Sequence, residues 1–248
     1  MITIQHTYGL IGYPLSHSFS KRYFTNKFER EGITDSVYEL FEIETIDRLP
    51  SVLDQNPTLR GLNVTIPYKQ QVMAFVDQLD AVAERIGAVN TVRIRDGKRT
   101  GFNSDYYGFR DSLTLWLSGV VIPQALVLGT GGASKAVVCV LQDMGISYTY
   151  VSRQSSEQAI SYGDLQKTNL RDYPLIINTT PLGMSPNIET CPELSYDQLT
   201  PEHYCYDLVY NPEQTAFMKK AQAYGAQTKN GLEMLQLQAE KSWEFWTS

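Results

Sequence analysis

Short apolar runs alternate with longer amphipathic stretches along most of this chain. Residues 8–12 (YGLIG), 37–43 (VYELFEI) and 61–66 (GLNVTI) are short runs rich in β-branched or aromatic residues, and each predicts a β-strand. Residues 19–30, between the first two runs, predict a helix. The first part of the chain is therefore expected to alternate strands with helices.

A turn dipeptide marks the next element. Asp96-Gly97 lies between two short runs, residues 89–95 and 99–102. This arrangement predicts a β-hairpin, because Asp-Gly favours the tight turn that joins antiparallel strands. A helical region that contains residues 75–87 is expected before the hairpin.

The second half follows the order of strand, turn and helix more clearly. Strands that alternate with helices form parallel βαβ units, in which ligands bind at the carboxyl ends of the strands. Ser104 or Asp105 is a suitable cap for the first helix. The predicted strands are residues 125–128, 147–153, 173–180 and 203–210, and the predicted helices are residues 104–118, one that ends at Gly145, and 232–246.

The pattern changes near Asn103, and we place a domain boundary there. Residues 1–103 form the first domain. The helix within residues 232–248 has apolar and aromatic side chains that are expected to pack back on it. Residues 104–231 form the second domain, so the predicted fold class is α/β with two domains.

Composition narrows the class of protein. The chain has 248 residues, 42% hydrophobic and 19% charged, as in ordinary globular proteins, and a formal net charge of −6. This charge argues against a general nucleic-acid binder. No apolar run approaches the ~20 residues that span a bilayer, and the start of the sequence lacks the pattern of a signal peptide. We expect a cytoplasmic protein without nucleic-acid or membrane partners.

Cysteine and histidine are few and scattered. The chain has 3 cysteines and 3 histidines. None of them has the C-x-x-C or paired spacing of a zinc site, and an odd number of cysteines does not suggest a disulfide framework. We therefore expect no metal and a reducing compartment.

A glycine-rich loop, GTGGASKAV at residues 129–137, follows an apolar strand and opens a helix. Gly129 allows a tight turn, and Gly131 and Gly132 allow the backbone to approach a pyrophosphate at the helix N-terminus. The alternative is a glycine-rich turn without a ligand, since such a motif alone is a weak signal. Its place between strand and helix favours nucleotide binding.

The choice of cofactor depends on the end of the next strand. NAD-binding folds carry an acidic residue there, whereas this strand ends in Ser152 and Arg153, with no carboxylate before Glu157. An arginine pairs well with a 2′-phosphate, which favours NADP. The alternative is an ordinary surface arginine after a strand.

Polar residues also follow the strands of the first domain. Asn63 and Thr65 alternate along one strand, so both point to one face. Pro67 ends this strand, and Lys69 follows at a corner between strand and helix. Taken singly, such residues are more often turns, caps or solvated lysines than catalysts. The other candidates of this kind are Ser16, Ser18, Ser20, Asn90 and Asp105.

Eight motifs in one order carry a family resemblance. They are GLIGYPLSHSFS, GLNVTIPYK, GAVNT, GFNSD, GTGGAS, INTTPLGM, YDLVYNP and NGLEMLQLQA. Together they resemble the shikimate dehydrogenase family over essentially the whole chain. The resemblance implies an NADPH-dependent, reversible reduction of 3-dehydroshikimate to shikimate. It also implies a substrate-binding domain, a Rossmann-type NADP-binding domain and a cleft between them.

The resemblance assigns roles to individual residues. By this resemblance, Ser18 and Ser20 bind the substrate carboxylate, and Tyr210 lies near the substrate. The residues that hydrogen-bond the ring hydroxyls are Asn63, Thr65, Asn90 and Gln238. Lys69 and Asp105 match the catalytic pair. The cofactor-binding positions are Gly129, Thr130, Gly131, Gly132, Ala133, Ser152, Arg153, Thr179, Leu208 and Gly231.

One position departs from the family's pattern, and two alternative functions stay open. Gln154 stands where the family often has a threonine after Ser152-Arg153, which weakens the NADP assignment without removing it. One alternative is a quinate/shikimate dehydrogenase that uses NAD, and the other is a nucleotide-binding homologue without catalysis. In either case the partner is a small molecule, and the chain is a monomer or a homodimer.

Overall fold

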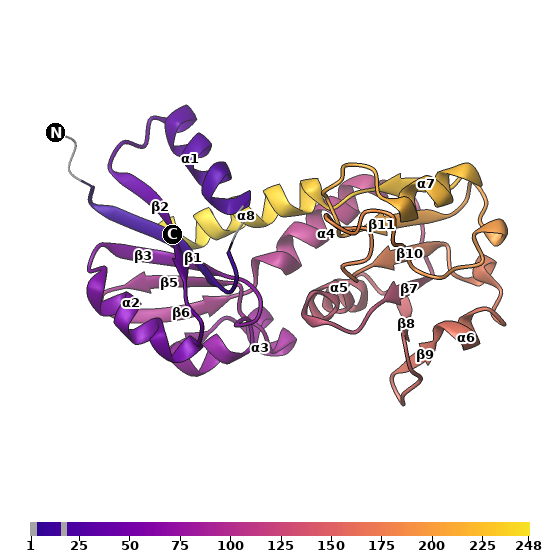
Figure 1. Cartoon of the computed structure of the whole chain (residues 1–248), viewed down its shortest axis with the longest axis horizontal. Helices are drawn as coiled ribbons and strands as arrows, with labels where there is room; N and C mark the ends of the chain where they lie inside the picture. The colour runs from indigo at the N-terminus through magenta and orange to yellow at the C-terminus, as the bar shows by residue number, and fades with distance from the viewer. Residues whose placement is uncertain (1–3, 16–18) are drawn as a thin grey trace. The chain divides into compact units, whose positions relative to one another are not determined.

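A computed structural model describes residues 4–15 and 19–248 of the chain (Figure 1). Ser16 and Ser18 lie outside the described residues. The chain divides into two compact units. The first contains the residues up to Ser104 together with Ala239–Ser248, and the second contains Asp105–Gln238. Each unit has its own sheet with helices packed on it, so the predicted α/β class is confirmed.

The first unit has a mixed sheet in the order β2-β1-β3-β5-β6-β4. β1 lies between β2 and β3 and is parallel to both, whereas β5 is antiparallel to β3 and to β6. The strands are β1 (His6–Gly12), β2 (Ser36–Glu42), β3 (Leu59–Val64), β4 (Gln78–Leu79), β5 (Thr91–Arg95) and β6 (Lys98–Phe102).

Helices cover both faces of this sheet. On one face, α1 (Phe19–Glu31) and the end of α8 (Leu232–Thr247) bury an aromatic cluster that includes Phe24 and Trp246. Gly61 of β3 is required there, because an added Cβ would lie 2.3 Å from the Trp246 ring. The other face is covered by η1 (Ile46–Arg48), α2 (Leu49–Gln55), η2 (Gln71–Phe75) and α3 (Ala81–Ile86). The part of the C-terminal helix from Ala239 onward therefore packs on the first unit, whereas Leu232–Gln238 belong to the second.

The hairpin is confirmed and the preceding helix is shorter than expected. Asp96 and Gly97 both have positive φ, 50° and 73°, as a tight hairpin turn requires. Residues 75–87 do not form one helix, because Gln78–Leu79 pair with β6 as a short strand. The helix begins only after Asp80, whose side chain accepts a hydrogen bond from the Val82 amide.

The second unit has a sheet of parallel strands in the order β12-β11-β10-β7-β8-β9. Numbered within the unit and read from β9, this is the order 3-2-1-4-5-6 of a doubly wound Rossmann fold, whose ligand site lies where the order reverses, between β7 and β10. The strands are β7 (Gln124–Leu128), β8 (Ser147–Ser152), β9 (Ala159–Ser161), β10 (Leu175–Asn178), β11 (Tyr204–Asp207) and β12 (Gln227–Lys229).

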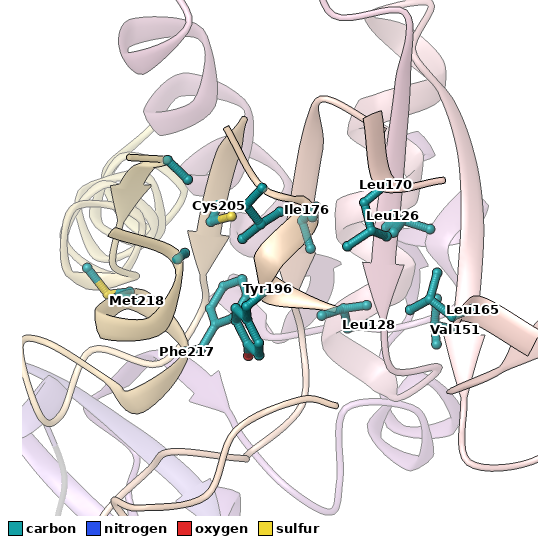
Figure 2. Packing of buried hydrophobic residues seen from close by; sticks show 13 residues of the cluster. Leu126, Leu128, Val151, Leu165, Leu170, Ile176, Tyr196, Cys205, Phe217 and Met218 are labelled. Atoms are coloured by element: carbon teal, nitrogen blue, oxygen red, sulfur yellow. The ribbon is translucent and has the colours of Figure 1, made fainter. Parts of the chain in front are cut away.

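Helices and a hydrophobic core complete the second unit. Figure 2 shows side chains of neighbouring strands, such as Leu126, Ile176 and Cys205, gathered in one cluster with Phe217 and Tyr196. The next residue of β11, Tyr206, points the other way and meets Phe109 and Trp116 of α4. The helices of this unit are α4 (Ser104–Trp116), α5 (Gly132–Asp143), α6 (Tyr162–Leu165), η3 (Leu170–Asp172), η4 (Tyr196–Gln198), α7 (Ala216–Ala223) and the first part of α8.

Candidate functional site

The corner after β3 is held by backbone hydrogen bonds. The Thr65 amide donates to the Ile11 carbonyl at 3.0 Å, and the Tyr68 amide donates to the Thr65 carbonyl at 2.9 Å. The Lys69 carbonyl accepts from the Val89 amide at 2.7 Å. Lys69 is half-buried in this turn, so its stem is anchored to β1 and to the start of the hairpin. The predicted strand-to-helix corner is confirmed, with the 3-10 helix η2 after it.

Asn63 is buried beneath this corner and is fully engaged by neighbours. It is 5% exposed. Its Oδ1 accepts from the Tyr38 hydroxyl at 2.7 Å, and its Nδ2 donates to the Ser242 hydroxyl at 3.0 Å. Burial raises the pKa of Tyr38, so this hydroxyl stays protonated and donates. The structure therefore shows Asn63 as an organising residue, and its contact with a ring hydroxyl stays a prediction.

Asn90 is oriented by the same buried network. Its Oδ1 accepts from the Ser104 amide at 2.6 Å and from the Thr91 hydroxyl at 3.1 Å. Ser242 joins Thr91 at 2.8 Å and Ser104 at 3.0 Å. Within the described residues, the amino group of Asn90 has no hydrogen-bond partner. That group is the part of Asn90 able to donate to a ligand.

Three further predicted residues lie at or just beyond the ends of helices and strands, and a fourth, Gln238, lies within α8. Ser20 lies in the first turn of α1, near enough to Tyr38 to oppose the rise in the pKa of that hydroxyl. Asp105 is half-buried in the first turn of α4. Gln238 donates to the Leu235 carbonyl at 2.9 Å, and Tyr210 is half-buried just beyond β11. Lys69 belongs to the first unit and Asp105 to the second, so their catalytic pairing stays a prediction.

The glycine loop of the second unit has the shape expected of a phosphate-binding turn. Gly129 has φ +102°, which favours glycine. An added Cβ at Gly131 or Gly132 would meet no atom within 4 Å, so the backbone borders open space. Gly131 caps α5 without a side chain, and the amides of the first turn need partners. Backbone N–H groups and the helix dipole there suit an anion.

A cavity of about 460 Å³ borders this loop. Arg153, at its rim after β8, is exposed and makes no ion pair with the described residues. The Ser152 hydroxyl donates to the Gln154 carbonyl and helps to shape the turn. The lining residues are Gly129, Thr130, Gly131, Val151, Ser152, Arg153, Tyr162, Thr179, Thr180, Pro181 and Leu182.

Buried polar groups hold the loop after β10, which also lines this cavity. The Asn178 Oδ1 accepts from the Thr180 amide and hydroxyl at 3.0 and 2.6 Å, and its Nδ2 donates to Asp207 at 2.9 Å. The Thr215 hydroxyl and the Val209 amide also donate to this carboxylate. Burial raises the pKa of Asp207 to about 6, although these hydrogen bonds oppose the shift. The loop after β10 is therefore held in place by Asn178, which is itself held by Asp207.

The structure explains why two of the predicted cofactor positions are a threonine and a glycine. The Thr179 hydroxyl donates to the Leu128 carbonyl at 2.8 Å, which joins the ends of β10 and β7. Gly231 passes so close to Leu208 that an added Cβ would lie 2.1 Å from its carbonyl oxygen. Ala133 follows in the first turn of α5. The loop amides, the open glycines and a free guanidinium together fit a dinucleotide with an additional phosphate.

Sequence reasoning missed several residues of the site. Thr180, which neighbours the predicted Thr179 in NTTPLG, had a usable signal as a polar residue at the end of a strand. Tyr162 had none, because it lies well beyond β8 and reaches the cavity only through the turn of the chain into α6. Ser242 was likewise hidden within an amphipathic helix.

The described residues show neither a metal site nor a membrane span. None of the groups of histidine, cysteine, aspartate and glutamate found in residues 4–15 and 19–248 has the arrangement of a metal site. Over the same part of the chain, every helix is too short or too polar to cross a bilayer.

Known proteins with similar sequences support the same family throughout the chain. A family model described as the shikimate dehydrogenase substrate binding domain matches residues 10–92. The shikimate dehydrogenase (NADP(+)) of Clostridium beijerinckii is 38% identical, over 96% of this chain and 91% of its own. That of Methanococcus aeolicus is 36% identical over the same two shares.

Solved structures agree with the sequence matches. The shikimate 5-dehydrogenase of Thermus thermophilus, in complex with NADP(H) and shikimate, superposes with a TM-score of 0.84 and 30% identity. The match covers 98% of this chain and 93% of that one. The chain described here belongs to the shikimate dehydrogenase family.

Proposed function

We propose that this chain is a shikimate dehydrogenase that interconverts shikimate and 3-dehydroshikimate with NADP. The observation that carries the proposal is the family match over 96% of the chain, to relatives named for NADP⁺-dependent shikimate dehydrogenase activity. The matched segment 10–92 includes Asn63, Thr65, Lys69 and Asn90. The glycine loop and Arg153 supply the features that a phosphorylated dinucleotide needs.

Most of the residues proposed to bind the substrate belong to the first unit, and Tyr210 and Gln238 belong to the second. Ser18 and Ser20 bind its carboxylate. Thr65, the Asn90 amino group and Gln238 bind the ring hydroxyls, with Tyr210 beside the ring. Asn63 completes the set, either by direct contact or by holding the strand end through Tyr38 and Ser242. Because Asn63 and Asn90 lie on a buried hydrogen-bond network, these two side chains lose little conformational entropy when the substrate binds.

The second unit is proposed to hold the cofactor. The amides of Gly129–Ala133 face the pyrophosphate, and Ser152 and Arg153 face the 2′-phosphate. Thr179, Leu208 and Gly231 border the rest of the dinucleotide. When bound, the nicotinamide supplies the hydride chemistry, and the protein supplies orientation and charge.

Lys69 and Asp105 are proposed to handle the proton at the reacting oxygen. Oxidation of the shikimate hydroxyl removes a hydride from carbon and a proton from oxygen. Lys69 donates a hydrogen bond to that oxygen and stabilises the negative charge that develops on it. Asp105 orients the lysine and shares the hydroxyl, so the proton leaves through this pair to water.

The absorbance of the reduced cofactor provides a direct test. Purified protein is mixed with shikimate or quinate and with NADP⁺ or NAD⁺, and reduction is followed over time. We expect the highest kcat/KM with shikimate and NADP⁺. Turnover only with quinate, preference for NAD⁺, or tight NADP⁺ binding without turnover would each overturn the proposal. We also propose a cytoplasmic enzyme, either monomeric or homodimeric, and light scattering would measure its mass.

A further inference from the structure

The first unit contains a second cavity, of about 610 Å³, at a different end of its sheet. It lies where β1, β2 and β3 begin, beside the hairpin turn and the last turns of α8. Its volume is within the range of small-molecule sites. The lining residues are His6, Tyr8, Ile33, Asp35, Ser36, Arg60, Ile94, Arg95, Asp96, Gly97, Trp243, Trp246 and Thr247.

This cavity is separate from the proposed substrate residues. β1 runs from His6, at the cavity, to Gly12. Thr65 lies at the far end of the strand, where its amide donates to the Ile11 carbonyl. A strand of this length spans roughly 20 Å, so the cavity and Thr65 lie at opposite ends of the strands.

Aromatic rings form one wall of the cavity. Tyr8 stacks on Trp246 with ring centroids 4.9 Å apart, and meets the edge of Trp243 at 5.2 Å. The indole nitrogen of Trp246 already donates to the Val92 carbonyl at 3.0 Å. This wall therefore offers apolar ring surface, which suits a flat ring in the ligand.

Two polar groups at the cavity lack partners. Tyr8 is 4% exposed, and its hydroxyl makes no hydrogen bond with any residue that the structure describes. Burial raises the pKa of Tyr8, so the hydroxyl stays protonated and can donate. The Nδ1 atom of His6 is buried and has no hydrogen-bond partner among the described residues. A buried nitrogen without a partner is costly, so a ligand that supplies one is favoured.

Two arginines and two aspartates border the cavity. Arg60 and Arg95 are exposed and form no ion pair in the described part of the chain. Asp35 is already engaged, since its Oδ1 accepts from the Ser36 hydroxyl at 3.2 Å and its Oδ2 lies 3.8 Å from His6 Nε2. Asp96 is the acidic residue of the hairpin turn. Both guanidinium groups lack an ion-pair partner in that part of the chain, so they are available to pair with a ligand carboxylate.

We propose that this cavity binds a small aromatic carboxylate, with its ring against Trp243 and its carboxylate held by Arg60, Arg95 and the Tyr8 hydroxyl. Arginine recognises carboxylates through two parallel hydrogen bonds, and the indole wall supplies the apolar contact. This site is independent of the dehydrogenase activity proposed above.

Phenylacetate is a suitable probe for the full chain, measured by calorimetry and by tryptophan emission. We expect saturable binding that shikimate does not displace. R60A and R95A are each expected to weaken binding about tenfold or more, as loss of a charge-assisted hydrogen bond implies. R48A removes an exposed arginine that does not line the cavity and is expected to bind like the natural protein. Equal binding by all four proteins, or displacement by shikimate, would overturn the site.

Further ligands and variants separate the parts of the proposal. Acetate carries the charge without the ring, and benzyl alcohol carries the ring without the charge, so both are expected to bind about tenfold more weakly or not at all. Equal binding of either one would contradict the combined site. L-Phenylalanine adds an ammonium group. If L-phenylalanine binds more tightly than phenylacetate, the ligand is an amino acid whose ammonium group pairs with Asp96. If it binds more weakly, the ligand is a carboxylic acid without an ammonium group.

Two further controls test whether the arginine variants fold normally and whether the probe binds at this cavity. R60A and R95A are expected to keep the melting temperature and shikimate oxidation rate of the natural protein, because both side chains are exposed and far from Thr65. The emission change is expected to be reduced in W243F, which keeps Trp246 of the same wall, and to persist undiminished in W116F, whose substitution lies in the other unit. A change lost only in W116F would place the probe elsewhere and refute the assignment.

Discussion

The two units prepare their candidate sites in different ways. In the first, buried side chains hold one another: Asn63, Thr91 and Ser104 all meet at Ser242. In the second, the loop after β7 borders open space with bare backbone, and the fixed groups, Asn178 and Asp207, hold the neighbouring loop after β10.

This difference reflects the ligands that the two units are proposed to bind. A small ring with several hydroxyls must be read by side chains, and these keep their orientation only when neighbours satisfy their other atoms. A pyrophosphate can be read by backbone amides, which need close approach and a helix N-terminus rather than particular side chains. Substitutions should therefore affect the two units in different ways.

The largest effect is expected from Lys69→Ala, which removes the proposed charge stabiliser and leaves the network intact. We expect kcat to fall about 100- to 1000-fold, as for other transition-state donors, with KM little changed and the melting temperature unaltered. Steady-state kinetics measure this. Lys98→Ala, an exposed lysine of the hairpin, is the matched control and should retain full activity. A kcat within a few-fold of the natural value would show that Lys69 has no catalytic role.

Asp207→Asn tests the buried support of the second unit through pH. Burial raises the folded-state pKa of Asp207 to about 6, from 3.8. Ionisation therefore costs the folded state about 3 kcal/mol at pH 7, and this cost is absent below pH 3.8. The stability associated with the protonated group is lost as pH rises through 6. In urea unfolding, we expect the variant to gain stability relative to the natural protein between about pH 4 and 7. A difference that does not vary with pH would contradict this.

Ser242→Ala tests the network of the first unit. The change leaves Asn63 Nδ2 and its neighbours short of a partner within a buried region, so we expect a loss of about 1–3 kcal/mol in the free energy of unfolding. KM for shikimate is expected to rise, because Asn63 and Asn90 lose their orientation. Ser118→Ala, at an exposed serine in the second unit, is the control. An unchanged free energy of unfolding would show that the Ser242 network does not stabilise the fold.

The smallest effect is expected from Gly131→Ala, which adds a methyl group where the structure has open space. The protein should fold normally, since no atom lies within 4 Å of the added Cβ. KM for NADP⁺ is expected to rise about tenfold if a phosphate occupies that space, with KM for shikimate unchanged. Gly163→Ala, whose Cβ would make an ordinary 3.6 Å contact, is the nearby control. Equal cofactor affinity in all three proteins would exclude this loop as the phosphate site.

Local patterns predicted most strands and helices, and their failures have identifiable causes. The hairpin at Asp96-Gly97 and the helices α1 and α8 follow the sequence closely, because turn chemistry and apolar periodicity are local properties. β4 was read as part of a helix, because Gln78–Leu79 become a strand only by pairing with the distant β6. β9 and β12 were also missed, since each is only three residues long.

The candidate site was predictable where a motif carries it. The glycine loop and Lys69 stand next to strand ends in the sequence, and the family resemblance named their companions. Tyr38 and Ser242 could not be found in this way, because their partner Asn63 is far away in the chain. Arg60 and Arg95 also look like ordinary surface residues until the sheet places them beside one cavity.

The sequence by itself determined the α/β class, the family and the positions of the glycine loop and the Lys69 corner, because these depend on local periodicity and on short motifs. Tertiary structure alone decided which polar groups are satisfied and which remain available. Asn63 is fully engaged, whereas the Asn90 amino group and the Tyr8 hydroxyl have no partner among the described residues. The physical reason is that a hydrogen bond depends on distance and burial in three dimensions, and strands far apart in the chain supply both.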